Sequence, residues 1–168
     1  MLLYNSYMIN CQFENGDKGG LRHVVTSALI VKGTKILLSK RGFYKGKPLL
    51  EFGKWSLVGG FLDRDETLEQ GIARETKEEI GAKIENLVLF RIVDSPNRKN
   101  DNRRQNVKFT YLAEIKDEKF IKSEEVTDRE WFDINELPKP DDIAFDFSDD
   151  LDLYKRYLKE KFSLPILG

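Results

Sequence analysis

The sequence has very few of the residues that crosslink a fold or bind transition metals. Cys11 is its single cysteine and His23 its single histidine among 168 residues. One cysteine excludes an internal disulfide and any zinc site built from several cysteines. A chain of this length buries enough apolar surface to fold without such crosslinks. We therefore interpret Cys11 as a bystander, and His23, at the start of a β-branched segment, as a structural residue.

Long apolar runs and a strong excess of one charge are missing as well. No segment approaches the roughly 18 apolar residues of a membrane span, and the N-terminus lacks the basic start of a signal peptide. The net charge is −1, so neither nucleic acid nor an anionic membrane is expected as the main partner. These absences favour a cytoplasmic protein.

What the sequence does contain is charge of both signs in a globular composition. Charged residues make up 34% and hydrophobic residues 40% of the chain, which predicts a single domain over residues 1–168. The polar, glycine-rich residues 14–20 predict a loop. This loop separates an N-terminal extension (1–20) from a core (21–140), and an amphipathic C-terminal helix is expected within residues 141–168.

Hydrophobic periodicity and turn residues predict the remaining elements. Strands are expected over 23–31, 36–41, 55–58, 83–94 and 107–115, and a strand end with a helical turn over 129–138. Polar loops are expected over 42–54 and 95–106. Helices are expected between Thr67 and Gly81 and over 149–162. This order of elements favours a mixed sheet with helices packed on its faces.

The helix after Thr67 carries three glutamates at an unusual position. Thr67 and Gln70 form a capping-box pattern, and Gly81 is placed to end the helix. On a helical wheel the packed stripe is made of five residues: Leu68, Ile72, Ala73, Thr76 and Ile80. Glu75 and Glu79 fall within about 20° of Leu68, at the edge of this stripe, and Glu78 lies beside them.

Carboxylates at the edge of a packed face need compensation. Like charges at these spacings destabilise a helix by roughly 0.2–0.5 kcal/mol per pair, and burial of an unpaired carboxylate costs more. A hard divalent cation such as Mg²⁺ would offset that cost. The alternative is an ordinary solvated helix face, and the octapeptide RETKEEIG (74–81) leaves both interpretations open.

A longer pattern surrounds this octapeptide. Gly60 is followed by five residues and Glu66, then by seven residues and Arg74-Glu75, then by Glu78-Glu79 and Gly81. The pattern resembles the signature of the Nudix (MutT-like) hydrolases at every fixed position. Two aliphatic positions depart from it, at Thr76 and Ala82, and Val58 stands where proline often precedes the two glycines. Together with the flanking segments 36–42 and 124–138, the resemblance covers about residues 23–140.

The resemblance implies a fold, a reaction and a set of residues. It implies an α/β (α+β) fold, namely an α/β/α sandwich with a mixed central sheet and the signature helix packed on it. It also implies a Mg²⁺- or Mn²⁺-dependent attack of water on the diphosphate of a nucleoside diphosphate derivative. By the same resemblance, the metal ligands are Gly59, Glu75, Glu78 and Glu79, with the Gly59 carbonyl as the backbone ligand. Arg74 holds a signature glutamate in position, and Glu66 supports the loop and the helix.

The general base and the substrate contacts are less determined. The base is either a signature carboxylate (Glu78 or Glu79) or a residue of the later loop, Glu124 or Glu125, which otherwise forms a solvated acidic turn. The candidate phosphate or ribose contacts are Arg41, Arg98, Arg103 and Arg104, and the alternative for the last three is a solvent-facing loop.

The residues around the signature favour one branch of the family. They resemble the branch that hydrolyses ADP-ribose, so the expected substrate is ADP-ribose or a related dinucleotide. A nucleoside triphosphate pyrophosphohydrolase that removes oxidised nucleotides is the alternative. A non-catalytic nucleotide-sensing domain is the alternative of another class, and the intact signature argues against it. Residues 1–20 add a strand or cross to a partner subunit, and a homodimer is expected.

Overall fold

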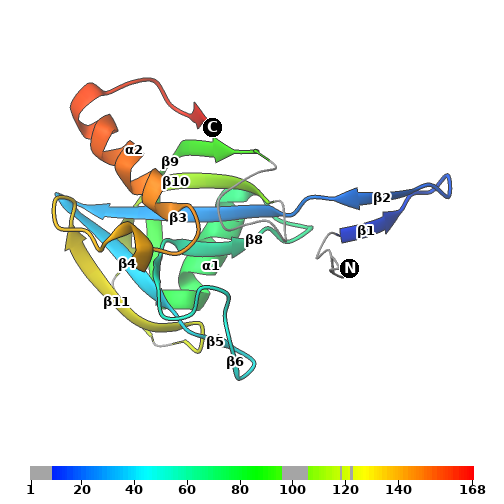
Figure 1. Cartoon of the computed structure of the whole chain (residues 1–168), viewed down its shortest axis with the longest axis horizontal. Helices are drawn as coiled ribbons and strands as arrows, with labels where there is room; N and C mark the ends of the chain where they lie inside the picture. The colour runs from blue at the N-terminus through cyan, green and yellow to red at the C-terminus, as the bar shows by residue number, and fades with distance from the viewer. Residues whose placement is uncertain (1–8, 96–105, 118, 122) are drawn as a thin grey trace.

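The structure, a computed structural model, describes residues 9–95, 106–117, 119–121 and 123–168. Its strands are β1 (Ile9–Gln12), β2 (Lys18–Leu21), β3 (Val24–Lys32), β4 (Lys35–Arg41), β5 (Phe43–Tyr44), β6 (Lys47–Pro48), β7 (Trp55–Ser56), β8 (Val58–Phe61), β9 (Lys83–Val93), β10 (Val107–Asp117), β11 (Val126–Asp133) and β12 (Ile166–Leu167). Its helices are α1 (Leu68–Ile80), a 3₁₀ turn η1 (Pro140–Asp142) and α2 (Phe147–Glu160). Figure 1 shows a central sheet with α1 and α2 on opposite faces.

The central sheet is mixed, as predicted, and one strand organises it. The strand order is β11-β4-β3-β10-β9-β12, with β10 parallel to β3 and β4 antiparallel to it. One edge of β3 is shared by two strands, because its end (Ile30–Lys32) pairs with β4 while its start (Val25–Ala28) pairs with β8. The chain leaves the sheet at the end of β8 and reaches α1 through the loop of residues 62–67.

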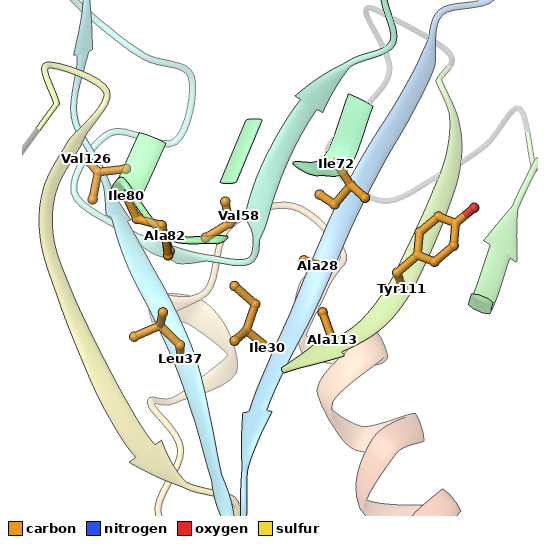
Figure 2. Close-up of a cluster of buried hydrophobic side chains, with 10 residues drawn as sticks. All are labelled: Ala28, Ile30, Leu37, Val58, Ile72, Ile80, Ala82, Tyr111, Ala113 and Val126. Carbon is orange, nitrogen blue, oxygen red and sulfur yellow. The ribbon is translucent and has the colours of Figure 1, made fainter. Parts of the chain in front are cut away.

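Alternation along β3 divides the core into two layers. Ala28 and Ile30 face α1, where they pack with Ile72 and Ile80, whereas Leu29 belongs to the cluster that packs against α2. Figure 2 shows Ile72 and Ile80 above the strands of the sheet. Successive residues of a strand point to opposite faces, so a sheet covered on both sides is expected from this apolar run. The sandwich predicted from the sequence is confirmed.

Helix α1 has the predicted boundaries. Thr67 accepts a hydrogen bond from the Gln70 N–H, the Gln70 side chain bonds the Thr67 N–H, and Gly81 ends the helix at φ 69°. Ala73, predicted to lie in the packed stripe, is exposed. Gly71 is buried instead: a Cβ there would lie 2.9 Å from Glu66 Oε1 and from Leu62 Cδ1. The loop before the helix thus needs a glycine at this point.

Other expectations differ from the structure in detail. Residues 14–20, predicted to be a loop, include most of strand β2, because β1 and β2 form a hairpin. The loop 42–54 contains the short β5–β6 hairpin. The segment before Pro138 makes only a hydrogen-bonded turn, with the Glu136 N–H on the Asp133 carbonyl at 2.9 Å. Helix α2 begins at Phe147, two residues before the predicted start. In the part of the chain that the structure describes, no helix is long and apolar enough to span a membrane.

Candidate active site

The candidate site lies where β8 passes from the sheet to α1, and both glycines there are needed. Gly59 has φ 149°, and a Cβ on it would collide with the backbone of Thr26 on β3. A Cβ on Gly60 would lie 2.5 Å from Glu75 Oε1. Two glycines therefore let β8 lie against β3 on one side while the carboxylate of α1 approaches it on the other.

Arg74 is the centre of the charged cluster on α1. Its Nε and Nη2 donate to the two carboxylate oxygens of Glu66 at 3.0 and 2.7 Å. Its Nη1 donates to Glu75 at 2.8 Å and to Glu78 at 3.1 Å. A bidentate arginine–carboxylate pair of this kind is strong and directional. The bond from Arg74 lowers the pKa of Glu66, and the bond to Glu66 raises the pKa of Arg74.

The loop before α1 is tied to the same arginine. Arg74 Nη2 also donates to the Phe61 carbonyl at 2.9 Å, and Glu66 accepts the Asp63 N–H at 2.8 Å. These bonds fix the segment between β8 and α1 to the helix. Glu66 therefore has a direct structural contact with Arg74 and with the loop.

Glu75 and Glu79 are carboxylates whose burial is not fully compensated. Burial raises the pKa of Glu75 although Arg74 bonds to it. Burial, and then the charge of Glu75, raise the pKa of Glu79 to about 8. The Gly59 N–H, 3.3 Å from Glu79 Oε2, and the charge of Arg41 act in the opposite direction. Desolvation with a like charge nearby is the usual cause of a raised carboxyl pKa.

The loop before β11 brings a further carboxylate to the site. The N–H groups of Gly42 and Phe43 donate to the Glu125 and Glu124 carbonyls at 2.7 and 2.9 Å. Ser123 Oγ donates to the Glu79 carbonyl at 2.8 Å. The loop is therefore bound both to the end of β4 and to α1.

The two glutamates of this loop have different surroundings. The Glu124 carboxylate accepts the Gly46 N–H at 2.6 Å and so belongs to the β5–β6 hairpin. Glu125 is partly buried, and its pKa is raised by burial and by the charge of Glu78. Its charge in turn raises the pKa of Glu79. Of the two loop candidates, Glu125 is the one that interacts with the carboxylates of α1.

Arg41, a candidate substrate contact at the end of β4, is close enough to α1 and to this loop for its charge to act on both. Its charge lowers the pKa of both Glu79 and Glu125. Its Nε donates to the Leu50 carbonyl at 2.7 Å, and its Cζ lies 4.8 Å from the centre of the Phe145 ring. Phe145 carries no motif and was not singled out from the sequence. The other three candidate contacts, Arg98, Arg103 and Arg104, lie outside the described residues.

The donor atoms of the site suit a divalent cation, although they are not arranged as a metal cage. Among the described residues, no three acidic, histidine or cysteine side chains form a group that could hold a metal ion. Arg74 donates to both Glu75 and Glu78, so oxygens of these two carboxylates are already bonded within the protein. Carboxylate oxygens are the ligands that Mg²⁺ prefers. A cation here would compete with Arg74 for Glu75 and Glu78 and relieve the buried charge of Glu79.

Comparisons with known proteins identify relatives of this chain. The chain is 32% identical over 134 residues to the ADP-ribose pyrophosphatase of Methanocaldococcus jannaschii. The aligned residues cover 80% of this chain and 73% of that protein. It is 32% identical over 111 residues to the NAD-capped RNA hydrolase NudC of Chromobacterium violaceum, where it spans 37% of the relative.

Solved structures give the same fold. A NUDIX hydrolase from Nitrosomonas europaea superposes with a TM-score of 0.74 at 26% identity, over 97% of this chain and 93% of that one. The sequence profile of the NUDIX domain matches residues 21–151. The signature, the sandwich and this match together show that the chain belongs to the Nudix hydrolase family.

Proposed function

We propose that this protein hydrolyses the diphosphate linkage of a nucleoside diphosphate derivative, with ADP-ribose or a related dinucleotide as substrate. The observation that carries the proposal is the pair Glu75 and Glu79. These carboxylates are held at the Gly59-Gly60 turn with less positive charge than their burial requires, and Glu125 and Arg41 adjoin them. The archaeal relative named an ADP-ribose pyrophosphatase supports the choice of substrate.

The residues take the following roles in this proposal. Glu75, Glu78, Glu79 and the Gly59 carbonyl hold Mg²⁺ (or Mn²⁺), which when bound neutralises the diphosphate and lowers the pKa of a water. Arg41 binds a phosphate of the substrate. Glu125 accepts the proton of the attacking water, because a raised pKa brings a carboxyl closer to the working pH of a general base. Arg74 and Glu66 position the carboxylates of α1 and the loop.

A substrate panel tests the proposal. The purified protein is incubated with Mg²⁺ or Mn²⁺ and, separately, with ADP-ribose, NADH, diadenosine polyphosphates and nucleoside triphosphates, and the products are identified. We expect AMP and ribose 5-phosphate from ADP-ribose, the products of water attack within the diphosphate. Hydrolysis of triphosphates alone would overturn the substrate class. No hydrolysis of any compound would overturn the catalytic function and favour a sensing domain.

We also propose that the protein is a homodimer. The hairpin of β1 and β2 projects from the central sheet (Figure 1). Within the described residues these two strands pair only with each other. An isolated two-stranded hairpin is marginally stable in water, so a second subunit packed against it would stabilise it. Sedimentation equilibrium of the full chain and of a variant without residues 1–21 tests this, with a dimer expected only for the full chain.

A further inference from the structure

The turn that leads into α2 contains a bulky residue in a conformation that bulky residues avoid. Phe145 has φ 55°, in the left-handed region, and it is not followed by a glycine. A side chain with a Cβ is disfavoured there, and such a conformation persists only where the surrounding structure imposes it. Phe145 is partly buried, so simple burial of its ring does not account for the conformation.

The residues on both sides of Phe145 are anchored to the sheet. The Ala144 N–H donates to the Trp55 carbonyl at 2.7 Å, and Ile143 forms a bridge with the same tryptophan. On the other side, Asp146 accepts a hydrogen bond from Lys108 Nζ at 3.1 Å, and the lysine side chain is 1% exposed. The turn is thus fixed at both ends, which sets the position of the Phe145 ring.

The Phe145 ring packs against the guanidinium of Arg41. The ring centre lies 4.8 Å from Arg41 Cζ, within the range of a cation–π contact. The Arg41 Nε–H is donated to the Leu50 carbonyl. With one face against a ring and Nε bonded to a carbonyl, the rotation of the guanidinium is restrained, and so is the direction of its two Nη groups. The charge of this group reaches both Glu79 and Glu125.

We propose that Phe145 is a positioning residue of the active site, which holds the Arg41 guanidinium in the orientation that binds a substrate phosphate. The proposal rests on the proposed function for the identity of the substrate. It assigns the segment before α2 a role in substrate binding, although this segment lies outside the Nudix signature and is anchored on the opposite face of the sheet. The Phe145 ring also makes an edge contact with the Phe147 ring, whose centre is 5.8 Å away, so a purely structural role is the alternative that the tests must exclude.

Steady-state kinetics with ADP-ribose and Mg²⁺ give the first test. In Phe145→Leu we expect KM to rise about three- to tenfold, the loss of one cation–π contact, with kcat within about twofold. Phe145→Tyr keeps the aromatic face and should retain the wild-type KM. In an Arg41→Ala background, Phe145→Leu should have no additional effect on KM. An unchanged KM in Phe145→Leu, or effects of the two substitutions that simply add, would overturn the proposal.

A second test does not depend on activity. The Nε–H signals of Arg41 and Arg74 are compared by ¹⁵N NMR in the wild type and in Phe145→Leu. We expect the Arg41 signal to shift and to exchange faster with water, while the Arg74 signal, held by Glu66, stays in place. An unchanged Arg41 signal would overturn the positioning role. If the wild type hydrolyses no nucleotide but the Arg41 signal responds, the proposed function fails and the positioning of Arg41 stands.

Discussion

Two charged clusters lie on opposite faces of the same sheet, and they differ in their balance of charge. The signature cluster sets Arg74, with Arg41 nearby, among Glu66 of the loop before α1 and Glu75, Glu78 and Glu79 of α1. The buried cluster under α2 sets two cations, Arg91 and Lys108, against two carboxylates, Asp146 and Asp150. The balanced cluster is the more deeply buried one, since Lys108 is 1% and Asp150 0% exposed.

The difference separates a structural use of charge from a reactive one. Buried charges are tolerated when each has a partner and its hydrogen bonds are satisfied. In the buried cluster every charge has an oppositely charged partner, although Arg91 Nε itself has no hydrogen-bond partner, and the cluster joins α2 to β9 and β10. The signature cluster has more carboxylates than cations, and the raised pKa of Glu79 is the consequence. An excess of negative charge of this kind favours a bound cation, as the proposed function requires.

Removing one charge from the buried cluster should have the largest effect on the free energy of unfolding. Asp150→Ala leaves Lys108 and Arg91 with one buried carboxylate fewer, and the free energy of unfolding should fall by about 3–5 kcal/mol. Asp149→Ala is the matched control, since Asp149 is exposed in the same helical turn and its loss should cost about 0.5 kcal/mol or less. Urea denaturation measures both. Equal effects of the two substitutions would contradict a stabilising role for the cluster.

In the signature cluster, removal of a charge should damage activity and spare the fold. Glu79→Gln removes a proposed metal ligand, and kcat/KM should fall about 1,000-fold, equivalent to several kcal/mol of lost transition-state stabilisation. The unfolding midpoint without metal should not fall, because a buried charge is removed. Glu69→Gln, an exposed position on the same helix, is the control with wild-type activity. Full activity in Glu79→Gln would contradict the proposal that Glu79 is a metal ligand.

The signature cluster was largely predictable from the sequence, and the buried cluster was not. Thr67, Gln70 and Gly81 determine α1 by local contacts, and the helical period alone places Glu75 and Glu79 at its packed edge. Asp150 looks like a solvated residue in the first turn of an amphipathic helix. Its partners Lys108 and Arg91 lie 42 and 59 residues away, and only strand pairing brings them to it.

A smaller part of the site depends on backbone conformation that has no sequence signal. Nothing in the residues around Phe145 indicates a left-handed turn, because the conformation is imposed by anchors on β7 and β10. One available signal was overlooked. Lys108 alternates with Thr110 and Leu112 along its strand, so all three face the same side. A lysine on the buried face of a strand predicts a buried acidic partner.

Substitutions of the two glutamates in the loop before β11 test which of them takes part in the reaction. Glu125→Gln removes the proposed proton acceptor, and kcat should fall about 100-fold with little change in KM. Glu124→Gln keeps an acceptor oxygen for the Gly46 N–H and should remain within about twofold of the wild type. Both are measured with saturating Mg²⁺ and ADP-ribose. Equal loss in the two variants would assign the effect to the loop conformation rather than to proton transfer.

A last expected effect is a slope of the free energy of unfolding with pH. The pKa of Glu79 is about 8 in the folded protein against an ordinary value of 4.5. The folded chain therefore binds more protons than the unfolded chain between these values, and the free energy of unfolding decreases as the pH rises through this window. Denaturation in the presence of a chelator should show this decrease in the wild type and a weaker one in Glu79→Gln.

A divalent cation should reduce this decrease of the free energy of unfolding with pH. Mg²⁺ binds the ionised carboxylates of the folded protein, so it stabilises the folded state more as the pH rises. Added Mg²⁺ should therefore raise the unfolding midpoint of the wild type at pH 8 more than at pH 5, and should have little effect on Glu79→Gln. Asp149→Ala should respond as the wild type does, because it leaves the signature cluster intact. An unfolding midpoint that does not change with Mg²⁺ at pH 8 would mean that the excess negative charge on α1 is compensated within the protein, as the charges under α2 are.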